Sequence, residues 1–164
     1  MKSIEDLIKK IKFVVFDFDG VFTNNQVIVN ENGAESVVCN RSDGLGLAKL
    51  KELKLGLLIL SKEANKVVLQ RAKKLGLDCI NGCDDKLVKI QQEACRCGLS
   101  LNEVAFVGND INDADCLNAV GFPIVVADSH PDVAILGKYK TRALGGCGAV
   151  REVCDMIYKV KKGT

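Results

Sequence analysis

The chain has 164 residues, of which 48% are hydrophobic and 27% are charged, with 15 glycines and two prolines. This composition excludes a disordered or fibrous chain, and the length predicts a single domain over residues 1–164. Lysine and arginine number 23 against 21 acidic residues, and this net charge of +2 argues against a nucleic-acid or polybasic membrane surface. No apolar run approaches the roughly 20 residues of a membrane span, and the N-terminal segment lacks the apolar stretch of a signal peptide. We therefore expect a cytoplasmic protein.

Cysteine usage agrees with that expectation. The chain has eight cysteines and a single histidine, His130, and it lacks the paired CxxC spacing of a structural zinc site. A chain without a secretory signal usually keeps its thiols reduced, so we expect most cysteines to be small apolar core residues.

Apolar runs of strand length alternate with segments of helical spacing along the chain. In chain order, we expect a strand at 12–17, a β-hairpin at 27–39, a helix at 43–53, a strand at 55–60, a helix at 64–75, a short strand at 79–80, a helix at 84–97, a single turn at 100–103, a strand at 104–107, a helix at 113–120, a strand at 122–126 and a helix at 149–160. The strands are apolar at successive positions, which is typical of parallel strands buried on both faces. The pattern predicts an α/β fold, a Rossmann-like open parallel sheet with helices on both faces and a small hairpin insertion.

Polar side chains follow three of these strands directly. Asp17 and Asp19 end the first, Ser61 follows the second, and Asn109 and Asp110 follow the strand at 104–107. Ligands of open α/β sheets bind beyond the carboxyl ends of the strands, so we expect the functional site there.

The residue types at this edge suit phosphoryl chemistry. A carboxylate that ends a buried strand is costly unless another charge compensates it, and oxygen-rich sites favour Mg²⁺. Asp113 adds a further carboxylate, Lys86 can supply a cation, and Ser61 offers a hydroxyl. Together with Asp17 as nucleophile and Asp19 as acid and base, these groups could hold and transfer a phosphoryl group.

Each residue also has a purely structural interpretation. An aspartate after a strand is often a turn residue or a helix N-cap, and Ser61 could cap the helix that follows it. Lys86 alone would be expected to lie in solvent. The combination and its order along the chain favour the chemical interpretation.

Four segments together resemble the haloacid dehalogenase superfamily of phosphohydrolases: DFDGV at 17–21, Ser61, Lys86 within DDK, and GNDINDAD at 108–115. The chain resembles most closely the small capless phosphatases typified by 3-deoxy-D-manno-octulosonate 8-phosphate phosphatase, over residues 12–155. This closer resemblance includes the hairpin, RSDGLGL at 41–47 and the tail GGCGAVREVCD at 145–155. The same subfamily includes phosphatases of sialic-acid-type nonulosonate 9-phosphates.

The resemblance implies roles for individual residues. Asp17 would form an aspartyl-phosphate, and Asp19 would protonate the leaving oxygen and then activate water. Mg²⁺ would be held by the Asp17 carboxylate, the Asp19 backbone carbonyl and Asp110. Ser61 and Lys86 would bind the phosphoryl oxygens, with Asp113 orienting Lys86 or the metal shell.

The residue two positions after Ser61 bears on the substrate. It is typically arginine in the octulosonate enzymes but is Glu63 here, as in the nonulosonate enzymes, and Arg71 and Lys74 also match the latter. The resemblance therefore favours a nine-carbon sugar acid. The alternative is that Glu63 is only a first-turn helix residue stabilised by the helix dipole.

The chain departs from the family pattern at several positions. Lys62 stands where glycine is usual, Asn109 where the first aspartate of GDD is common, and Cys147 where the tail usually has arginine. The position that ligates metal, Asp110, is retained. Family members form ring-like tetramers in which neighbours close the active site, and the apolar hairpin at 27–39 is consistent with such a partner.

Two other functions remain open at this point. One is a catalytically silent oligomerisation domain associated with an acylneuraminate cytidylyltransferase; the other is a response-regulator-like receiver, which also uses aspartates and a lysine around Mg²⁺. The presence of all five residues of the set favours the enzyme over a silent relic: Asp17, Asp19, Lys86, Asp110 and Asp113. The receiver accounts poorly for DFDGV and GNDIND.

Overall fold

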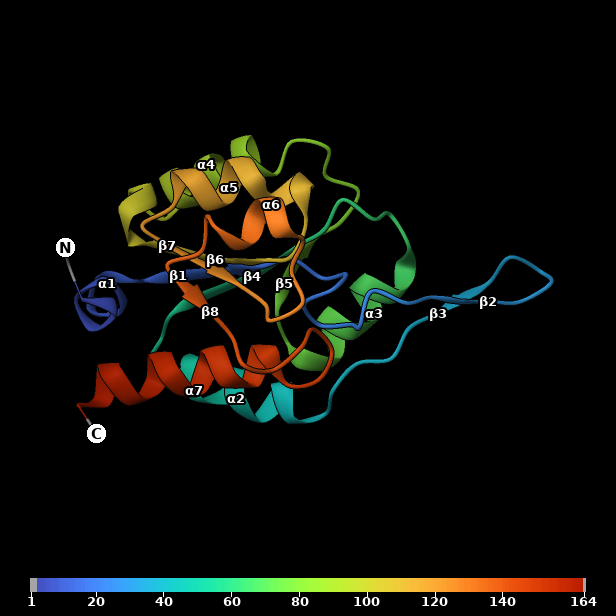
Figure 1. The fold of residues 1–164 in the computed structure, drawn as a ribbon, viewed down its shortest axis with the longest axis horizontal. Helices are drawn as coiled ribbons and strands as arrows, with labels where there is room; N and C mark the ends of the chain where they lie inside the picture. Colours follow the sequence, from blue (N-terminus) through green and yellow to red (C-terminus); the bar gives the residue numbers. More distant parts are fainter. Residues whose placement is uncertain (1–2, 164) are drawn as a thin grey trace.

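The centre of the fold is a parallel β-sheet, shown in Figure 1 in a computed structural model that describes residues 3–163. Within these residues the sheet has six strands, in the spatial order β5 (Asp78–Ile80), β4 (Gly56–Leu60), β1 (Phe13–Phe16), β6 (Val104–Gly108), β7 (Phe122–Val125) and β8 (Tyr139–Lys140). Every pairing in this sheet is parallel. β1 is central, and Phe13 lies opposite both Gly56 and Val104.

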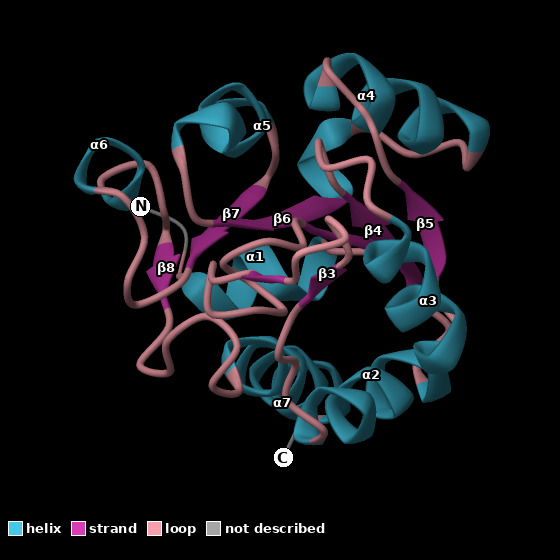
Figure 2. Ribbon diagram, turned by 90° about the vertical axis from the view of Figure 1, so that its right-hand side faces the viewer, coloured by secondary structure: helices cyan, strands magenta, loops and turns pink. Residues whose placement is uncertain are grey.

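Helices cover both faces of the sheet (Figure 2). One layer contains α1 (Ile4–Lys10), α2 (Ser42–Glu52), α3 (Lys66–Leu75) and α7 (Ala149–Lys162). The other contains α4 (Lys86–Arg96), α5 (Ala114–Ala119) and α6 (Pro131–Ala134), while the short η1 (Leu101–Glu103) and η2 (Ile111–Asp113) flank β6. Side chains of β1 alternate between the two layers, with Val14 and Phe16 in the first core and Phe13 and Val15 in the second. Because both faces are covered, the four central strands β1, β4, β6 and β7 contain no polar side chain.

The structure confirms the predicted fold class and shifts some helix starts. The helix expected from residue 64 begins at Lys66, because the Asn65 side chain caps it by accepting the N–H of Val67. The helix expected from residue 84 begins at Lys86, with Asp85 as the cap that accepts the N–H of Val88. Four elements were not predicted: α1, the three-residue η2, the four-residue α6 and the two-residue β8.

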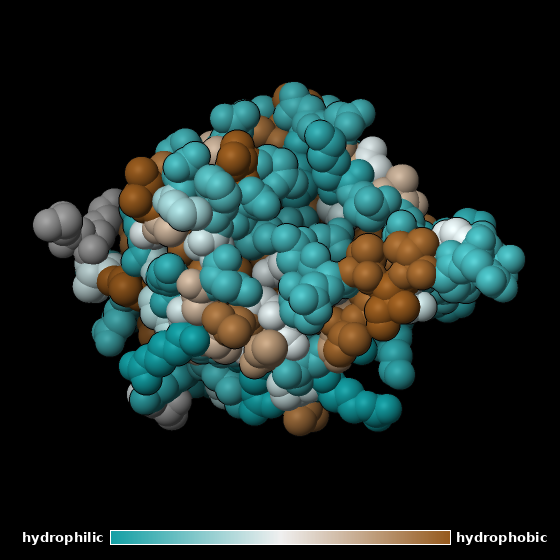
Figure 3. All heavy atoms as spheres, turned by 45° about the vertical axis from the view of Figure 1, so that its right-hand side comes forward, coloured by the Kyte–Doolittle hydropathy of each residue, from teal (hydrophilic) through white to brown (hydrophobic). Residues whose placement is uncertain are grey.

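The predicted hairpin is present as β2 (Ile28–Val29) and β3 (Glu35–Ser36), and it projects from the body at the right of Figure 1. Its turn is closed by the Asn30 side chain, which accepts the N–H groups of Asn32 and Ala34. Its apolar side chains lie largely in solvent, with exposed fractions of 52% to 64% at the following positions: Val27, Ile28, Val29 and Val38. Figure 3 shows apolar side chains gathered where the hairpin leaves the body, beside a hydrophilic tip.

The eight cysteines are all free thiols. Only Cys116 and Cys154 are buried, so the expectation that most cysteines are core residues is wrong. In the part of the chain that the structure describes, no helix is both long and apolar enough to span a membrane. Over the same residues the hairpin is the insertion near the carboxyl edge of the sheet, and no cap domain is present.

Candidate active site

A cavity of about 580 Å³ lies at the carboxyl ends of the central strands and reaches the hairpin. Asp17 and Asp19 enter it from the loop after β1, Ser61 from the end of β4, and Asp110 from the end of β6. The structure therefore brings together side chains that are distant in the sequence, at the edge of the sheet where the sequence placed them.

The floor of this region is a buried charged triad made of Asp17, Lys86 and Asp113. Lys86 Nζ lies 2.8 Å from Asp17 Oδ1 and 2.8 Å from Asp113 Oδ1. All three residues are buried, with exposed fractions of 4%, 4% and 0%. The expectation that an isolated Lys86 would lie in solvent is therefore wrong, because the two carboxylates replace its hydration.

The buried triad carries one more negative charge than positive. Burial alone would lower the pKa of Lys86, but the charges of Asp17 and Asp113 raise it above its usual value. Burial, and then the charge of Asp113, raise the pKa of Asp17, against the opposing effect of Lys86. A cation bound at Asp17 would remove this imbalance.

The turn after β6 explains how Asp113 reaches the buried triad. Asp113 Oδ2 accepts the N–H of Asn109 at 2.9 Å, while Asp110 Oδ1 accepts the N–H of Ile111 at 2.7 Å. Asp110 and Asp113 form a reciprocal capping box around η2. This arrangement turns Asp113 inward to Lys86 and leaves Asp110 at the cavity, so the structural interpretation of Asp113 as a capping residue is confirmed and its chemical role stays a prediction.

Asp19 and Ser61 form the next part of the cavity wall. Burial and the charge of Glu63 raise the pKa of Asp19, with Glu35 adding to the rise, while Lys86 and a hydrogen bond with Ser61 oppose it. The Ser61 hydroxyl is buried and accepts the N–H of Glu63 at 3.0 Å. Ser61 does not cap α3, because Asn65 does.

The donors present fit a hard divalent cation. The carboxylates of Asp17 and Asp110 both line the cavity, and the backbone carbonyl of Asp19 was the third donor expected from the sequence. Within residues 3–163 no three acidic, histidine or cysteine side chains converge as a ready-made metal site. The expected site needs only two carboxylate side chains, and the excess negative charge of the buried triad is consistent with it.

The three candidate substrate residues separate into two regions. Glu63 lines the cavity with Asp17, and because α3 begins at Lys66 it is not a first-turn residue of that helix. Arg71 and Lys74 line a second hollow of about 840 Å³ between β3 and α3. Arg71 Nη2 donates to the Asn40 carbonyl at 2.7 Å. A role for Arg71 and Lys74 in substrate binding stays a prediction.

Two residues that separate these hollows were not found from the sequence. Asn65 donates its Nδ2–H to Glu35 Oε2 at 2.6 Å and its backbone N–H to Glu63 Oε1 at 3.0 Å. The bond from Asn65 ties the hairpin to the start of α3. The position of Asn65 before a helical run was an available capping signal, whereas nothing local marks Glu35 as a cavity residue.

The glycine-rich tail packs against the loop after Asp19. A Cβ on Gly145 would collide with the carbonyl of Gly20, and the N–H of Gly146 donates to the Val21 carbonyl at 3.0 Å. Only glycine permits this approach of two backbones. Cys147 follows this contact and is exposed.

Comparison with known proteins places this arrangement in a family. No family model matches the chain. The 3-deoxy-D-manno-octulosonate 8-phosphate phosphatase KdsC of Yersinia pestis is 32% identical over 157 residues, covering 93% of this chain and 84% of that protein. The KdsC protein of Escherichia coli K12 is 32% identical over 150 residues, covering 91% and 80%.

Solved structures agree in fold. The Moraxella catarrhalis 3-deoxy-D-manno-octulosonate 8-phosphate phosphatase, in complex with magnesium ion, phosphate ion and KDO, is 35% identical with a TM-score of 0.94, covering 98% of this chain and 92% of that one. The cobalt-bound phosphatase of Haemophilus influenzae is 28% identical with a TM-score of 0.90, covering 95% and 92%. A divalent metal is thus found in this family. The chain belongs to the KdsC-like phosphatases of the haloacid dehalogenase superfamily, enzymes that hydrolyse a phosphate monoester.

Proposed function

We propose that this protein is a Mg²⁺-dependent cytoplasmic phosphatase that acts on the phosphate monoester of a 2-keto-3-deoxy sugar acid. The substrate is 3-deoxy-D-manno-octulosonate 8-phosphate or an N-acylneuraminate-type nonulosonate 9-phosphate. The observation that carries the proposal is the buried triad beneath a cavity that also contains Asp19, Ser61 and Asp110. The activity named for the KdsC relatives supports it.

In this proposal Asp17 is the nucleophile. Its carboxylate attacks phosphorus, the bond to the sugar oxygen breaks, and an aspartyl-phosphate forms on Asp17. Lys86, 2.8 Å from Asp17 Oδ1, holds the nucleophile and faces the phosphoryl oxygens together with the Ser61 hydroxyl. Uncatalysed monoester hydrolysis is so slow that enzymes accelerate it by up to ~10²¹-fold, so stabilisation of charge must dominate the catalysis.

Asp19 acts as the proton carrier. Its partly buried carboxyl has a raised pKa, which favours the protonated form that donates to the leaving sugar oxygen. The resulting carboxylate then takes a proton from the water that hydrolyses the aspartyl-phosphate. Mg²⁺, held by Asp17, Asp110 and the Asp19 carbonyl, would supply positive charge for the phosphoryl oxygens.

The nine-carbon substrate is favoured by Glu63. In the octulosonate enzymes this position typically holds arginine, which suits a carboxylate, whereas Glu63 lies in the cavity as an acceptor for hydroxyl or amide N–H groups. Its Oε1 accepts the N–H of Asn65, so the carboxylate has a fixed position. A fixed acceptor suits a substrate that is rich in donors.

We further propose a homotetramer in which neighbouring copies cover the cavity. The exposed apolar side chains of the hairpin support this assembly, because a contiguous apolar patch on the surface usually marks an interaction site. Light scattering combined with an activity assay tests it: a fully active monomer would contradict it.

Phosphate release with Mg²⁺ tests the function. The 8-phosphate of 3-deoxy-D-manno-octulosonate is compared with neuraminate-type and deaminated nonulosonate 9-phosphates, and we expect the highest kcat/KM for a 9-phosphate. Preference for the 8-phosphate would overturn the argument from Glu63 but keep the reaction. Turnover of none of them by protein that binds Mg²⁺ would favour the silent oligomerisation domain.

Asp17→Asn serves as the catalytic control in the same assay. Loss of the nucleophile should reduce kcat by at least about 1,000-fold. The variant should remain folded, because asparagine has the same shape and removes one of two like charges. Retained turnover by folded Asp17→Asn protein would contradict the mechanism.

A further inference from the structure

The cavity above the buried triad has one positively charged side chain among its described lining residues, that of Lys62. Lys86 lies below, and its ammonium is held by two buried carboxylates. The rest of the charged lining is acidic and includes Glu35 and Glu63 as well as the aspartates. Lys62 is therefore the cation available to the part of a ligand that extends away from the buried triad.

Lys62 makes no ion pair or hydrogen bond through its side chain within residues 3–163, although carboxylates line the same cavity. The nearest of them along the chain, Glu63, already accepts the N–H of Asn65 at 3.0 Å. The side chain of Lys62 is exposed, so its ammonium is available to an incoming group.

The backbone on both sides of Lys62 is fixed. The N–H of Ser61 donates to the Ile80 carbonyl at 2.9 Å, and the Ser61 carbonyl accepts the N–H of Cys83 at 3.1 Å. The Glu63 carbonyl accepts the N–H of Gly82 at 3.1 Å. The base of the Lys62 side chain is thus anchored, and only its flexible stem moves.

The proposed substrate carries two anionic groups at opposite ends of its carbon chain, a phosphate and a carboxylate. If the phosphate lies over the buried triad, the carboxylate meets the outer part of the cavity, where Glu35 and Glu63 would repel it. Arg71 and Lys74 line the other hollow, and Arg71 donates to the Asn40 carbonyl. Among the described residues that line the cavity itself, Lys62 is the one that can supply the countercharge for the carboxylate.

We propose that Lys62 is a specificity-determining residue that pairs with the carboxylate of the sugar acid, an inference that rests on the proposed function. Lys86 serves the phosphate end and Lys62 the carboxylate end. The two lysines together distinguish a sugar-acid phosphate from a neutral sugar phosphate. Glu35 and Glu63 repel any second anionic group of the ligand that Lys62 does not neutralise.

A variant and a substrate analogue together test the pair. Lys62→Gln removes the charge of the protein, and a C1 amide of the sugar-acid phosphate removes the charge of the substrate. On the acid, we expect Lys62→Gln to lower kcat/KM about fivefold, which is the upper end of what a solvent-accessible ion pair contributes. On the amide, the variant should match the unaltered enzyme, and Lys62→Arg should restore turnover of the acid. Lys66→Gln, an exposed lysine outside this cavity, is the matched control.

Each other outcome overturns the inference in a recognisable way. Equal losses on acid and amide would place Lys62 at the phosphate or in the local fold, and no loss on either would make it a solvated lysine. If the unaltered enzyme hydrolyses p-nitrophenyl phosphate but no sugar-acid phosphate, the proposed function fails and this inference fails with it.

Discussion

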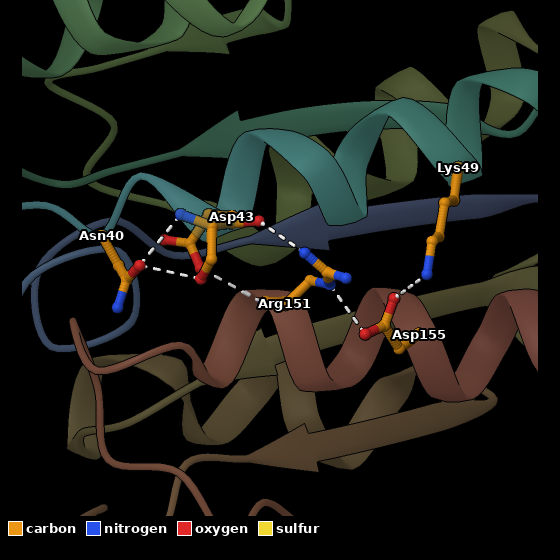
Figure 4. A network of polar contacts seen from close by, with 6 residues as sticks. Asn40, Asp43, Lys49, Arg151 and Asp155 are labelled. Carbon is orange, nitrogen blue, oxygen red and sulfur yellow. Dashed lines mark hydrogen bonds and ion pairs between the residues drawn. The ribbon is translucent and has the colours of Figure 1, made fainter.

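Two clusters of charged side chains in this molecule differ in burial and in charge balance. One is the buried triad beneath the cavity, and the other is a network between α2 and α7 that Figure 4 shows. In the network, Asp155 accepts from Lys49 Nζ and from Arg151 Nε, each at 2.7 Å. Asp43 accepts the backbone N–H of Arg151 at 3.2 Å. Two cations here face two carboxylates, whereas the buried triad has two carboxylates for one cation.

The difference shows what each cluster does. The ion pairs of the network are partly open to water, with side-chain exposed fractions of 29% to 40%. They join two helices but contribute little to the free energy of unfolding, because their charges lose little hydration. The buried triad is dry and unbalanced, which is unfavourable for an empty protein. Such a cluster is consistent with a site that gains its missing charge from a bound cation.

The largest effect on stability is expected from breaking the buried triad. Asp113→Ala should lower the free energy of unfolding by about 3 kcal/mol, because it removes a partner of a buried ammonium and leaves the N–H of Asn109 without an acceptor. Urea unfolding monitored by circular dichroism measures it. A loss below about 1 kcal/mol would show that water replaces the carboxylate.

Asp43 sharpens the comparison, because it is the buried member of the network. It is 1% exposed, and its Oδ2 has no hydrogen-bond partner among the described residues. Burial raises its pKa to about 6, against the N–H of Arg151 and the charges of Arg71 and Arg151. The folded-state pKa lies above the ordinary value of 3.8, so stability due to this group falls as pH rises from about 4 to about 6.

Asp43→Asn should remove that dependence while keeping an acceptor for Arg151. We expect the variant to gain about 2 kcal/mol on the unaltered protein between pH 4 and pH 6, with a nearly constant difference above about pH 7. Urea unfolding at several pH values measures it, with the exposed Asp78→Asn as control. A difference that is the same at every pH would exclude titration of Asp43 as its cause.

The smallest effect is expected at the open end of the network. Asp155→Ala removes the same kind of group as Asp113→Ala, yet it should cost less than about 1 kcal/mol, because Lys49 and Arg151 return to water. The loss should shrink further in 1 M salt, where the screening length is about 3 Å. A loss as large as that of Asp113→Ala would remove the distinction between the two clusters.

The sequence predicted the sheet because burial on both faces leaves a local record, runs of apolar residues that end in polar ones. It also placed Asp17, Ser61 and Asp110 at one edge, since parallel strands end on the same side. The N-terminal helix α1 was missed although Ile4, Leu7 and Ile8 have helical spacing, because the intervening charges obscured it. The two residues of β8 are too few to carry a pattern.

The outer cavity could not be predicted in the same way. Glu35 reaches it only because the hairpin folds toward α3 and Asn65 bonds to its carboxylate. Arg71 and Lys74 follow Glu63 closely in the sequence, yet the start of α3 turns them into the other hollow. These outcomes depend on the direction of a loop, which local spacing does not encode.

The position of β1 between β4 and β6 has a consequence for motion. The backbone of β1 is hydrogen-bonded on both sides, so the strand that leads to Asp17 opens only when the sheet opens. Within residues 3–163, β2 pairs with β3 alone. Local unfolding therefore reaches the hairpin first. We therefore expect the hairpin to open while the backbone before Asp17 stays in place.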